Sequence, residues 1–207
     1  MKIIESCEQG SSEWLDMRLG KITASRVKDV MSKGRGVAPS KMSESYMMEL
    51  IAEILTGQSK PFFENDAMRW GTEKEPQARD MYKLKNDFVK VDEVAFIELN
   101  DFVGMSPDGL VGDDGLLEIK CPTTTTQIKR ALSEDYSADY KAQIQMQLWV
   151  SGRKWCDFVS FDPRLECKAG YLQQRVMRDE EYIEEMAAKC STFICSMKEK
   201  IKALTDA

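Results

Sequence analysis

Apolar side chains recur along the chain at helical and strand spacing, and this pattern predicts a series of helices and strands. The segment 43–56 has the clearest helical spacing, with Ser43 as the expected N-cap and Gly57 as the expected end. Further helices are expected at 23–32, 73–85, 137–150 and 179–204, and strands at 88–98, 102–111, 116–121, 155–161 and 170–177.

This order of elements predicts an α/β (α+β) fold in which a mixed β-sheet is flanked by helices. A loop is expected at 34–39, where glycines flank Arg35 and a proline follows. The chain contains no repeat, low-complexity tract or linker. Since 207 residues suffice for one full hydrophobic core, we expect a single domain over residues 1–207.

Composition narrows the class of protein. The 43% hydrophobic and 31% charged residues are typical of a globular protein, and no apolar run reaches the length of a membrane span. No signal peptide is apparent, so we expect a cytoplasmic protein with reduced thiols. The six cysteines contain no CxxC pair and the chain has no histidine, which excludes the usual zinc patterns.

The net charge of −6 is unfavourable for a protein that binds nucleic acid. This charge does not exclude DNA binding, because the attraction of DNA depends on the local electric field along one groove and not on the net charge. A bound metal would also neutralise nearby acidic side chains. The basic residues available for such a groove are Lys33, Arg35, Lys41, Lys129 and Arg130. Each of them can equally be an ordinary surface charge.

The segment from Ser106 to Lys120 places three ionisable groups within one expected hairpin. Glu118 and Lys120 are one residue apart on a strand, so both project from the same face, while Leu117 and Ile119 face the interior. A turn at Asp113-Asp114-Gly115 folds the chain back. Asp108 is then expected opposite Glu118 to Lys120, at roughly 5–8 Å between side-chain origins.

Two carboxylates and an ammonium can hydrolyse a phosphodiester without histidine. Asp108 and Glu118 can hold a hard cation such as Mg²⁺, and Lys120 can orient or deprotonate a water. The alternative is an exposed hairpin with an ordinary surface ion pair. Pro107 and Gly109 favour the functional interpretation, because proline fixes the backbone before Asp108 and glycine allows a ligand to approach.

Four further residues have both a functional and a structural interpretation. Ser25 lies where the expected helix 23–32 begins. The unpaired backbone amides at this helix start could bind a phosphate, and the Arg18 guanidinium could contact the same phosphate. Alternatively, Ser25 or Thr23 is a plain N-cap and Arg18 a surface charge. Glu75 completes a capping box with Thr72, and Gln143 shares a helix face with Gln147 that solvent could cover.

Five blocks of sequence resemble the phage lambda exonuclease family, the YqaJ-like viral recombinases within the PD-(D/E)xK nucleases. The active-site block consists of Ser106-Pro107-Asp108-Gly109-Leu110 and Leu117-Glu118-Ile119-Lys120-Cys121-Pro122. The other blocks, in family order, begin at Trp14, Met68, Ala142 and Phe161. Together they cover about residues 10 to 180, and five blocks in order are highly specific.

The resemblance implies a restriction-endonuclease-like core and a role for each matching residue. Asp108, Glu118 and the Ile119 carbonyl would bind one or two Mg²⁺ or Mn²⁺ ions. The catalytic set would be Asp108, Glu118, Lys120, Gln143 and Glu75. Arg18 and Ser25 would hold a 5′-phosphate, Arg35 would enter the minor groove, and Met68 would separate the terminal base pairs. Arg35 as a loop charge and Met68 as a core residue remain alternatives, and Glu98 is a weak candidate.

The resemblance also implies an activity. The family digests linear double-stranded DNA from 5′ ends to mononucleotides and leaves a 3′ single strand. It forms a homotrimeric ring and cooperates with a single-strand annealing protein, which implies a phage or prophage protein of the bacterial cytoplasm. The alternatives are an endonucleolytic or RecB-like nuclease, a catalytically silent DNA-end-binding module, and a metal-binding protein unrelated to DNA.

Overall fold

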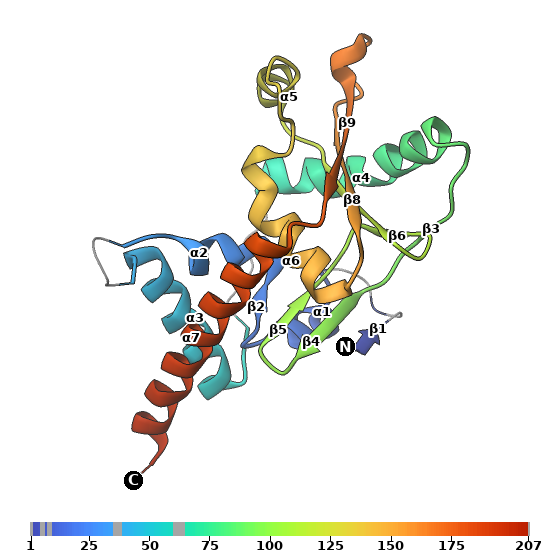
Figure 1. Cartoon of the computed structure of the whole chain (residues 1–207). Helices are drawn as coiled ribbons and strands as arrows, with labels where there is room; N and C mark the ends of the chain where they lie inside the picture. Colours follow the sequence, from blue (N-terminus) through green and yellow to red (C-terminus); the bar gives the residue numbers. More distant parts are fainter. Residues whose placement is uncertain (1, 5–6, 8–9, 35–38, 60–64, 207) are drawn as a thin grey trace.

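Two mixed β-sheets form the centre of the fold (Figure 1). The computed structural model describes residues 2–4, 7, 10–34, 39–59 and 65–206. One sheet has, in spatial order, β3 (Val91–Asp92), β6 (Gly109–Val111), β7 (Gly115–Lys120), β8 (Trp155–Phe161) and β9 (Tyr171–Met177). The other has β1 (Lys2–Ile4), β4 (Phe96–Asn100), β5 (Val103–Met105) and β2 (Ile22–Thr23). Parallel pairing joins β7 to β8 and β2 to β5, whereas the other pairs are antiparallel.

Helices flank these sheets, as expected for the predicted fold class. They are α1 (Ser12–Arg18), α2 (Val27–Met31), α3 (Lys41–Thr56), α4 (Asp66–Lys85), α5 (Thr124–Ala131), α6 (Lys141–Ser151) and α7 (Glu180–Thr205). Short 3₁₀ turns occur at η1 (Ala24–Arg26), η2 (Ala138–Tyr140) and η3 (Lys168–Gly170). None of the helices in the described ranges combines the length and the apolar character needed to cross a bilayer.

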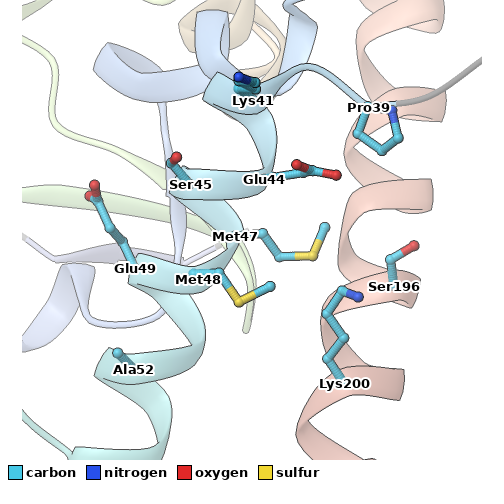
Figure 2. Close-up of a pocket in the computed structure, with 10 residues that line it drawn as sticks. All are labelled: Pro39, Lys41, Glu44, Ser45, Met47, Met48, Glu49, Ala52, Ser196 and Lys200. Carbon is cyan, nitrogen blue, oxygen red and sulfur yellow. The ribbon is translucent and has the colours of Figure 1, made fainter. Parts of the chain in front are cut away.

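The helices α3 and α7 lie side by side and border a cavity of about 920 Å³ (Figure 2). Met47 and Met48 of α3 and Lys200 of α7 are among the side chains that line it. Lys41, a candidate for the basic groove, also lines it, but none of the expected catalytic, metal-binding or phosphate-binding residues, all of which the structure describes, lies there.

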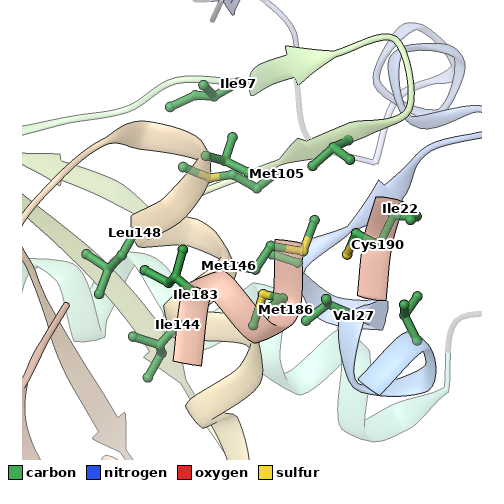
Figure 3. Close-up of a cluster of buried hydrophobic side chains, with 14 of the residues drawn as sticks. Ile22, Val27, Ile97, Met105, Ile144, Met146, Leu148, Ile183, Met186 and Cys190 are labelled. Carbon is green, nitrogen blue, oxygen red and sulfur yellow. The ribbon is translucent and has the colours of Figure 1, made fainter. Parts of the chain in front are cut away.

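Strand β7 is buried on both faces, which places its charged residues inside the fold. Leu117 and Ile119 pack against Ala78 and Tyr82 of α4 in one apolar cluster, as the alternating pattern predicts. Leu116 belongs to a second cluster, to which α6 contributes Ile144, Met146 and Leu148. Figure 3 shows this second cluster, in which Ile183 and Met186 of α7 lie beside the side chains of α6 and Cys190 lies beside Ile22.

Two of the expected strands are each divided between the two sheets. The segment 88–98 contains β3 and the start of β4, and 102–111 contains β5 and β6. Pro107 explains the second division, because proline has no N–H to donate to a sheet ladder. The chain therefore leaves one sheet after β5 and enters the other at β6, and Asp108 lies at this crossing.

Helix boundaries differ from the predictions where capping residues compete. Ser40, not Ser43, caps α3, since its side chain accepts a hydrogen bond from the Ser43 amide at 3.0 Å. Asn65 caps α4 through the Met68 amide, so this helix begins at Asp66 rather than near residue 73. Thr72 lies inside α4 and donates to the Met68 carbonyl, which makes the predicted capping box of Thr72 and Glu75 wrong.

The hairpin turn and four short elements also differ from the pattern. The left-handed residue of the β6–β7 turn is Gly112, with φ of 52°, and Gly115 is the first residue of β7. The helices α1 and α5 and the strands β1 and β2 were not predicted. In α5, three consecutive threonines mask the helix, because β-branched residues have low helix propensity.

Candidate active site

The three ionisable groups of the hairpin converge as expected. The Lys120 ammonium lies 2.5 Å from Glu118 Oε1, so both side chains project from the same face of β7. Gly109 pairs with Leu117, which places Asp108 opposite Glu118. The Ile119 amide donates a hydrogen bond of 2.6 Å to Asp108 Oδ2. The alternative of an exposed hairpin with a surface pair is therefore wrong.

Two glutamines of α6 hold the Glu118 carboxylate, which is 1% exposed. Gln143 Nε2 donates to Oε1 and Gln147 Nε2 to Oε2, each at 2.6 Å. Residues four apart share a helix face, so both amides reach the same carboxylate from successive turns. Gln143 thus lies in the site and not on a solvated face. Gln147 was not predicted as a site residue, although its spacing from Gln143 was the available signal.

An arginine that the sequence analysis did not single out connects Glu75 to Asp108. Arg79 Nη2 lies 2.6 Å from Glu75 Oε1 and also donates to the Asp108 carbonyl at 3.0 Å. Glu75 itself lines the same cavity as Asp108, Ile119 and Lys120, which has a volume of about 410 Å³. The structure therefore places Glu75 at the edge of the candidate site.

The charges in this cavity act strongly on one another. Burial, together with the negative charges of Glu118 and Glu75, raises the pKa of Asp108 well above its usual value. Burial disfavours the ammonium of Lys120, but attraction to Glu118 and Asp108 outweighs it and raises the pKa of Lys120. Lys120 is therefore held as a cation, 5.2 Å from the centre of the Tyr140 ring. A charged lysine can orient a water but cannot accept its proton.

The cavity fits a divalent cation by its charge and by its donor atoms. Three carboxylates gather around one lysine, and burial together with the repulsion from the other two carboxylates raises the pKa of Asp108. Carboxylate and carbonyl oxygens are the ligands that Mg²⁺ and Mn²⁺ prefer. Among the described residues, no group of three acidic, cysteine or histidine side chains forms a complete cage. Such a site would use one or two carboxylates, water and substrate phosphate, as is common for Mg²⁺.

Arg18 and Ser25 line a second cavity, of about 460 Å³. The Arg18 guanidinium lies 4.0 Å from the centre of the Trp14 ring and donates to Ser106 Oγ at 3.4 Å. Burial lowers the pKa of Arg18 to about 10, so it stays charged at neutral pH with part of its hydration removed. Ser25 lies inside the η1 turn and is not an N-cap. Thr23 instead occupies the N-cap position of this turn, without a side-chain cap hydrogen bond, so the N-cap alternative holds for Thr23 and is wrong for Ser25. The alternative of Arg18 as a surface charge is wrong, because its guanidinium is largely buried.

Met68 lies between the two cavities and lines both of them. Its side chain is 39% exposed, so the alternative of a core residue is wrong. Ser106 forms a second connection, because it accepts a hydrogen bond from Trp14 Nε1 at 2.9 Å and directly precedes Pro107 and Asp108. The cavity lined by Arg18 is thus fixed relative to the carboxylates.

Other expected residues lie elsewhere. Arg35 falls outside the described residues. Glu98 forms an ion pair of 3.4 Å with Lys21. Arg130 is buried and donates to Ser160 Oγ at 2.5 Å, so it does not contribute to an exposed basic groove. Gly109 does not leave room for a ligand either, because a Cβ at this position would collide with Val91 of β3.

The cavity between α3 and α7 is larger than either of these two but offers less chemistry (Figure 2). Its charged residues, among them Lys41, Glu44 and Lys200, lie along exposed helix surfaces. Buried carboxylates and an ammonium converge instead at Asp108, Glu118 and Lys120, and we place the candidate active site there.

Comparison with known proteins identifies a family and solved structures that are similar to this chain. The profile of the YqaJ-like viral recombinase domain matches residues 13–154. The crystal structure of an alkaline exonuclease, LHK-Exo from Laribacter hongkongensis, is 41% identical, with a TM-score of 0.87 over 95% of this chain and 97% of the other. Its complex with dAMP is 42% identical, with a TM-score of 0.86 over the same shares.

A more distant structure shows the same fold. The phage-related exonuclease from Haemophilus somnus 129PT is 17% identical, with a TM-score of 0.69 over 89% of this chain and 96% of the other. No curated protein sequence matches the chain. The family profile covers most of the chain, and the 41% identity to LHK-Exo extends over almost all of it. The chain therefore belongs to the YqaJ-like viral recombinase family, that of the lambda-type alkaline exonucleases.

Proposed function

We propose that this exonuclease is metal-dependent and degrades one strand of linear double-stranded DNA in the 5′-to-3′ direction. It releases mononucleotides and leaves a 3′ single-stranded overhang for recombination by strand annealing. The observation that carries the proposal is the place of Met68, between the cavity of Arg18 and that of Asp108 and Lys120. A terminal phosphate and a scissile phosphodiester can thus be bound side by side.

The residues of the metal cavity have separate tasks in hydrolysis. Asp108, Glu118 and the Ile119 carbonyl would hold one or two Mg²⁺ or Mn²⁺ ions, which supply a more acidic water and stabilise charge on the phosphate. Gln143 and Gln147 fix both oxygens of Glu118 through hydrogen bonds of 2.6 Å. Lys120 orients the attacking water and offsets negative charge as it develops on the phosphate.

The residues of the second cavity account for direction. Arg18 supplies a guanidinium whose fork can bind two phosphate oxygens, and Ser25 adds a hydroxyl in the same cavity. Met68, a long and soft side chain that lines both cavities, would separate the last base pair. Each cleavage creates a new 5′-phosphate, which Arg18 and Ser25 can bind for the next cycle. The Glu75 carboxylate, held by Arg79, completes the edge of the catalytic cavity.

Digestion of end-labelled duplexes tests this function directly. With Mg²⁺, we expect mononucleotides from the strand that carries a 5′-phosphate, an intact complementary strand and an uncut closed circle. Cleavage of the circle would favour an endonuclease, and binding of ends without cleavage would favour a silent end-binding module. Excess EDTA is expected to stop digestion and added Mg²⁺ to restore it. Undiminished digestion in EDTA contradicts the metal-dependent mechanism.

Arg18→Ala is expected to abolish the preference for phosphorylated ends. A charge-assisted hydrogen-bonded contact contributes about 1.5–3 kcal/mol, so digestion of 5′-phosphorylated duplex should slow by about 10–100-fold. Digestion of the same duplex with a 5′-hydroxyl should change little. Arg18→Lys keeps the charge but loses the planar fork, and an intermediate effect is expected. An equal loss on both substrates would show that Arg18 does not bind the terminal phosphate.

The resemblance to the lambda-type family supports two further proposals about partners. The protein assembles into a homotrimeric ring around DNA, and it acts with a single-strand annealing protein in the bacterial cytoplasm. Sedimentation equilibrium at increasing concentration tests the first, with an expected mass of three times the 23.6 kDa of the chain. A monomer at all concentrations contradicts it.

A further inference from the structure

Arg79 connects three separate parts of the chain at the edge of the active site. It extends from α4, is 9% exposed, and uses all three guanidinium nitrogens. Nε and Nη2 donate to the Asp108 carbonyl at 3.2 and 3.0 Å, and Nη2 also reaches Glu75 Oε1 at 2.6 Å. Nη1 lies 3.2 Å from Glu93 Oε2, in the segment between β3 and β4.

These contacts matter because of where Asp108 lies. It occupies the crossing between the two sheets, after Pro107 and immediately before β6. The Ile119 amide fixes its carboxylate from β7 at 2.6 Å, and Arg79 fixes its carbonyl from α4. The main chain and the side chain of Asp108 are thus held from two different elements.

An arginine suits this position better than a lysine. Glu75 and Arg79 are four residues apart on α4, a spacing that on an exposed helix contributes only a few tenths of a kcal/mol. Here the guanidinium is buried, and its planar fork reaches a carbonyl and two carboxylates at once. A lysine would keep the charge but could not hold all three in fixed directions.

We propose that Arg79 is a positioning residue for divalent cation binding. It supports this binding by holding Asp108 and Glu75 in fixed positions relative to each other at one side of the cavity. The inference deepens the proposed function and rests on it. Arg79 does not line the catalytic cavity, and it acts through Asp108 and Glu75 rather than on the substrate.

Calorimetric binding of Mn²⁺ to the full chain without DNA tests this role. We expect Arg79→Gln to weaken Mn²⁺ binding by about 10-fold or more, since both held groups are released. Arg79→Lys should have a smaller effect. Glu93→Gln alters only the exposed partner of Arg79 and leaves the contacts of Arg79 with Asp108 and Glu75 in place, so it should weaken Mn²⁺ binding about 2–3-fold. This variant still tests the proposal if the Arg79 variants fail to fold.

Arg175→Gln is the matched control for a purely structural arginine. Arg175 donates to the buried Asp157 at 2.8 Å and joins β8 to β9 outside the cavity, so its loss should lower the melting temperature without changing Mn²⁺ affinity. If all folded Arg79 and Glu93 variants bind Mn²⁺ as the unaltered protein does, the proposal is overturned and the proposed function stands. If the unaltered protein binds no Mn²⁺, both are overturned.

Discussion

Asp108→Asn is expected to lower the rate of duplex digestion at least about 10³-fold while the protein remains folded. The substitution keeps the shape of the side chain and an oxygen that can accept the Ile119 N–H, so the hairpin is retained. It removes one negative charge from the cavity, where the carboxylate would bind a divalent cation. The measurement is the initial rate on a 5′-phosphorylated duplex at saturating Mg²⁺, with the melting temperature measured alongside.

Asp113→Asn supplies the control for this loss. Asp113 is exposed in the turn at the opposite end of the same β6–β7 hairpin, and its substitution should change the rate less than about twofold. Binding of the duplex by the Asp108→Asn protein, measured by fluorescence anisotropy, should persist because Arg18 is unaltered. If the Asp108→Asn protein keeps a tenth of the original rate, Asp108 does not bind the metal.

The local pattern was sufficient to predict the centre of the site. Alternation along β7 placed Glu118 and Lys120 on one face and Leu117 on the other, and the expected hairpin placed Asp108 opposite them. These features depend on residues close in sequence, whose geometry the strand period determines. The predicted mixed sheet flanked by helices follows from the same local information.

The pattern of apolar and polar residues could not predict that the strands divide into two sheets. Residues 102–111 have continuous strand character, but the missing N–H of Pro107 interrupts the ladder, and β5 and β6 then pair in different sheets. Each half pairs with a neighbour in the chain and with one strand from further away. β5 pairs with its hairpin neighbour β4 and with β2, whereas β6 pairs with its hairpin neighbour β7 and with β3.

Partners that approach from distant elements were also missed. Gln147 and Arg79 each follow an expected site residue at helical spacing, Gln143 and Glu75 respectively. The same spacing is abundant on solvated helices, where such pairs contribute little. Only the packing of α6 and α4 on opposite faces of β7 shows that these side chains face Glu118 and Asp108.

The core that supports α6 should be costly to disrupt. Leu148→Ala is expected to lower the free energy of unfolding by about 3 kcal/mol, because Leu148 is 0% exposed and its truncation leaves a cavity. In a protein of this size the melting temperature should fall by about 9 °C. Leu148 directly follows Gln147 on α6, so a loosened core face also loosens the amides that hold Glu118.

Leu84→Ala provides the matched comparison, since Leu84 also lies in a helix but is 56% exposed. Its substitution should change the free energy of unfolding by less than about 0.5 kcal/mol. Urea denaturation of both variants measures the difference in the free energy of unfolding. With an unchanged dependence of this free energy on urea, the difference appears as a shift of the urea concentration at which half of the protein is unfolded. Equal midpoints for the two variants would mean that α6 does not pack against the core as described. If α6 packs as described, the Leu148→Ala protein should digest DNA more slowly even when it is folded, well below its melting temperature. If α6 does not pack against the core, the rate of digestion should be unaffected.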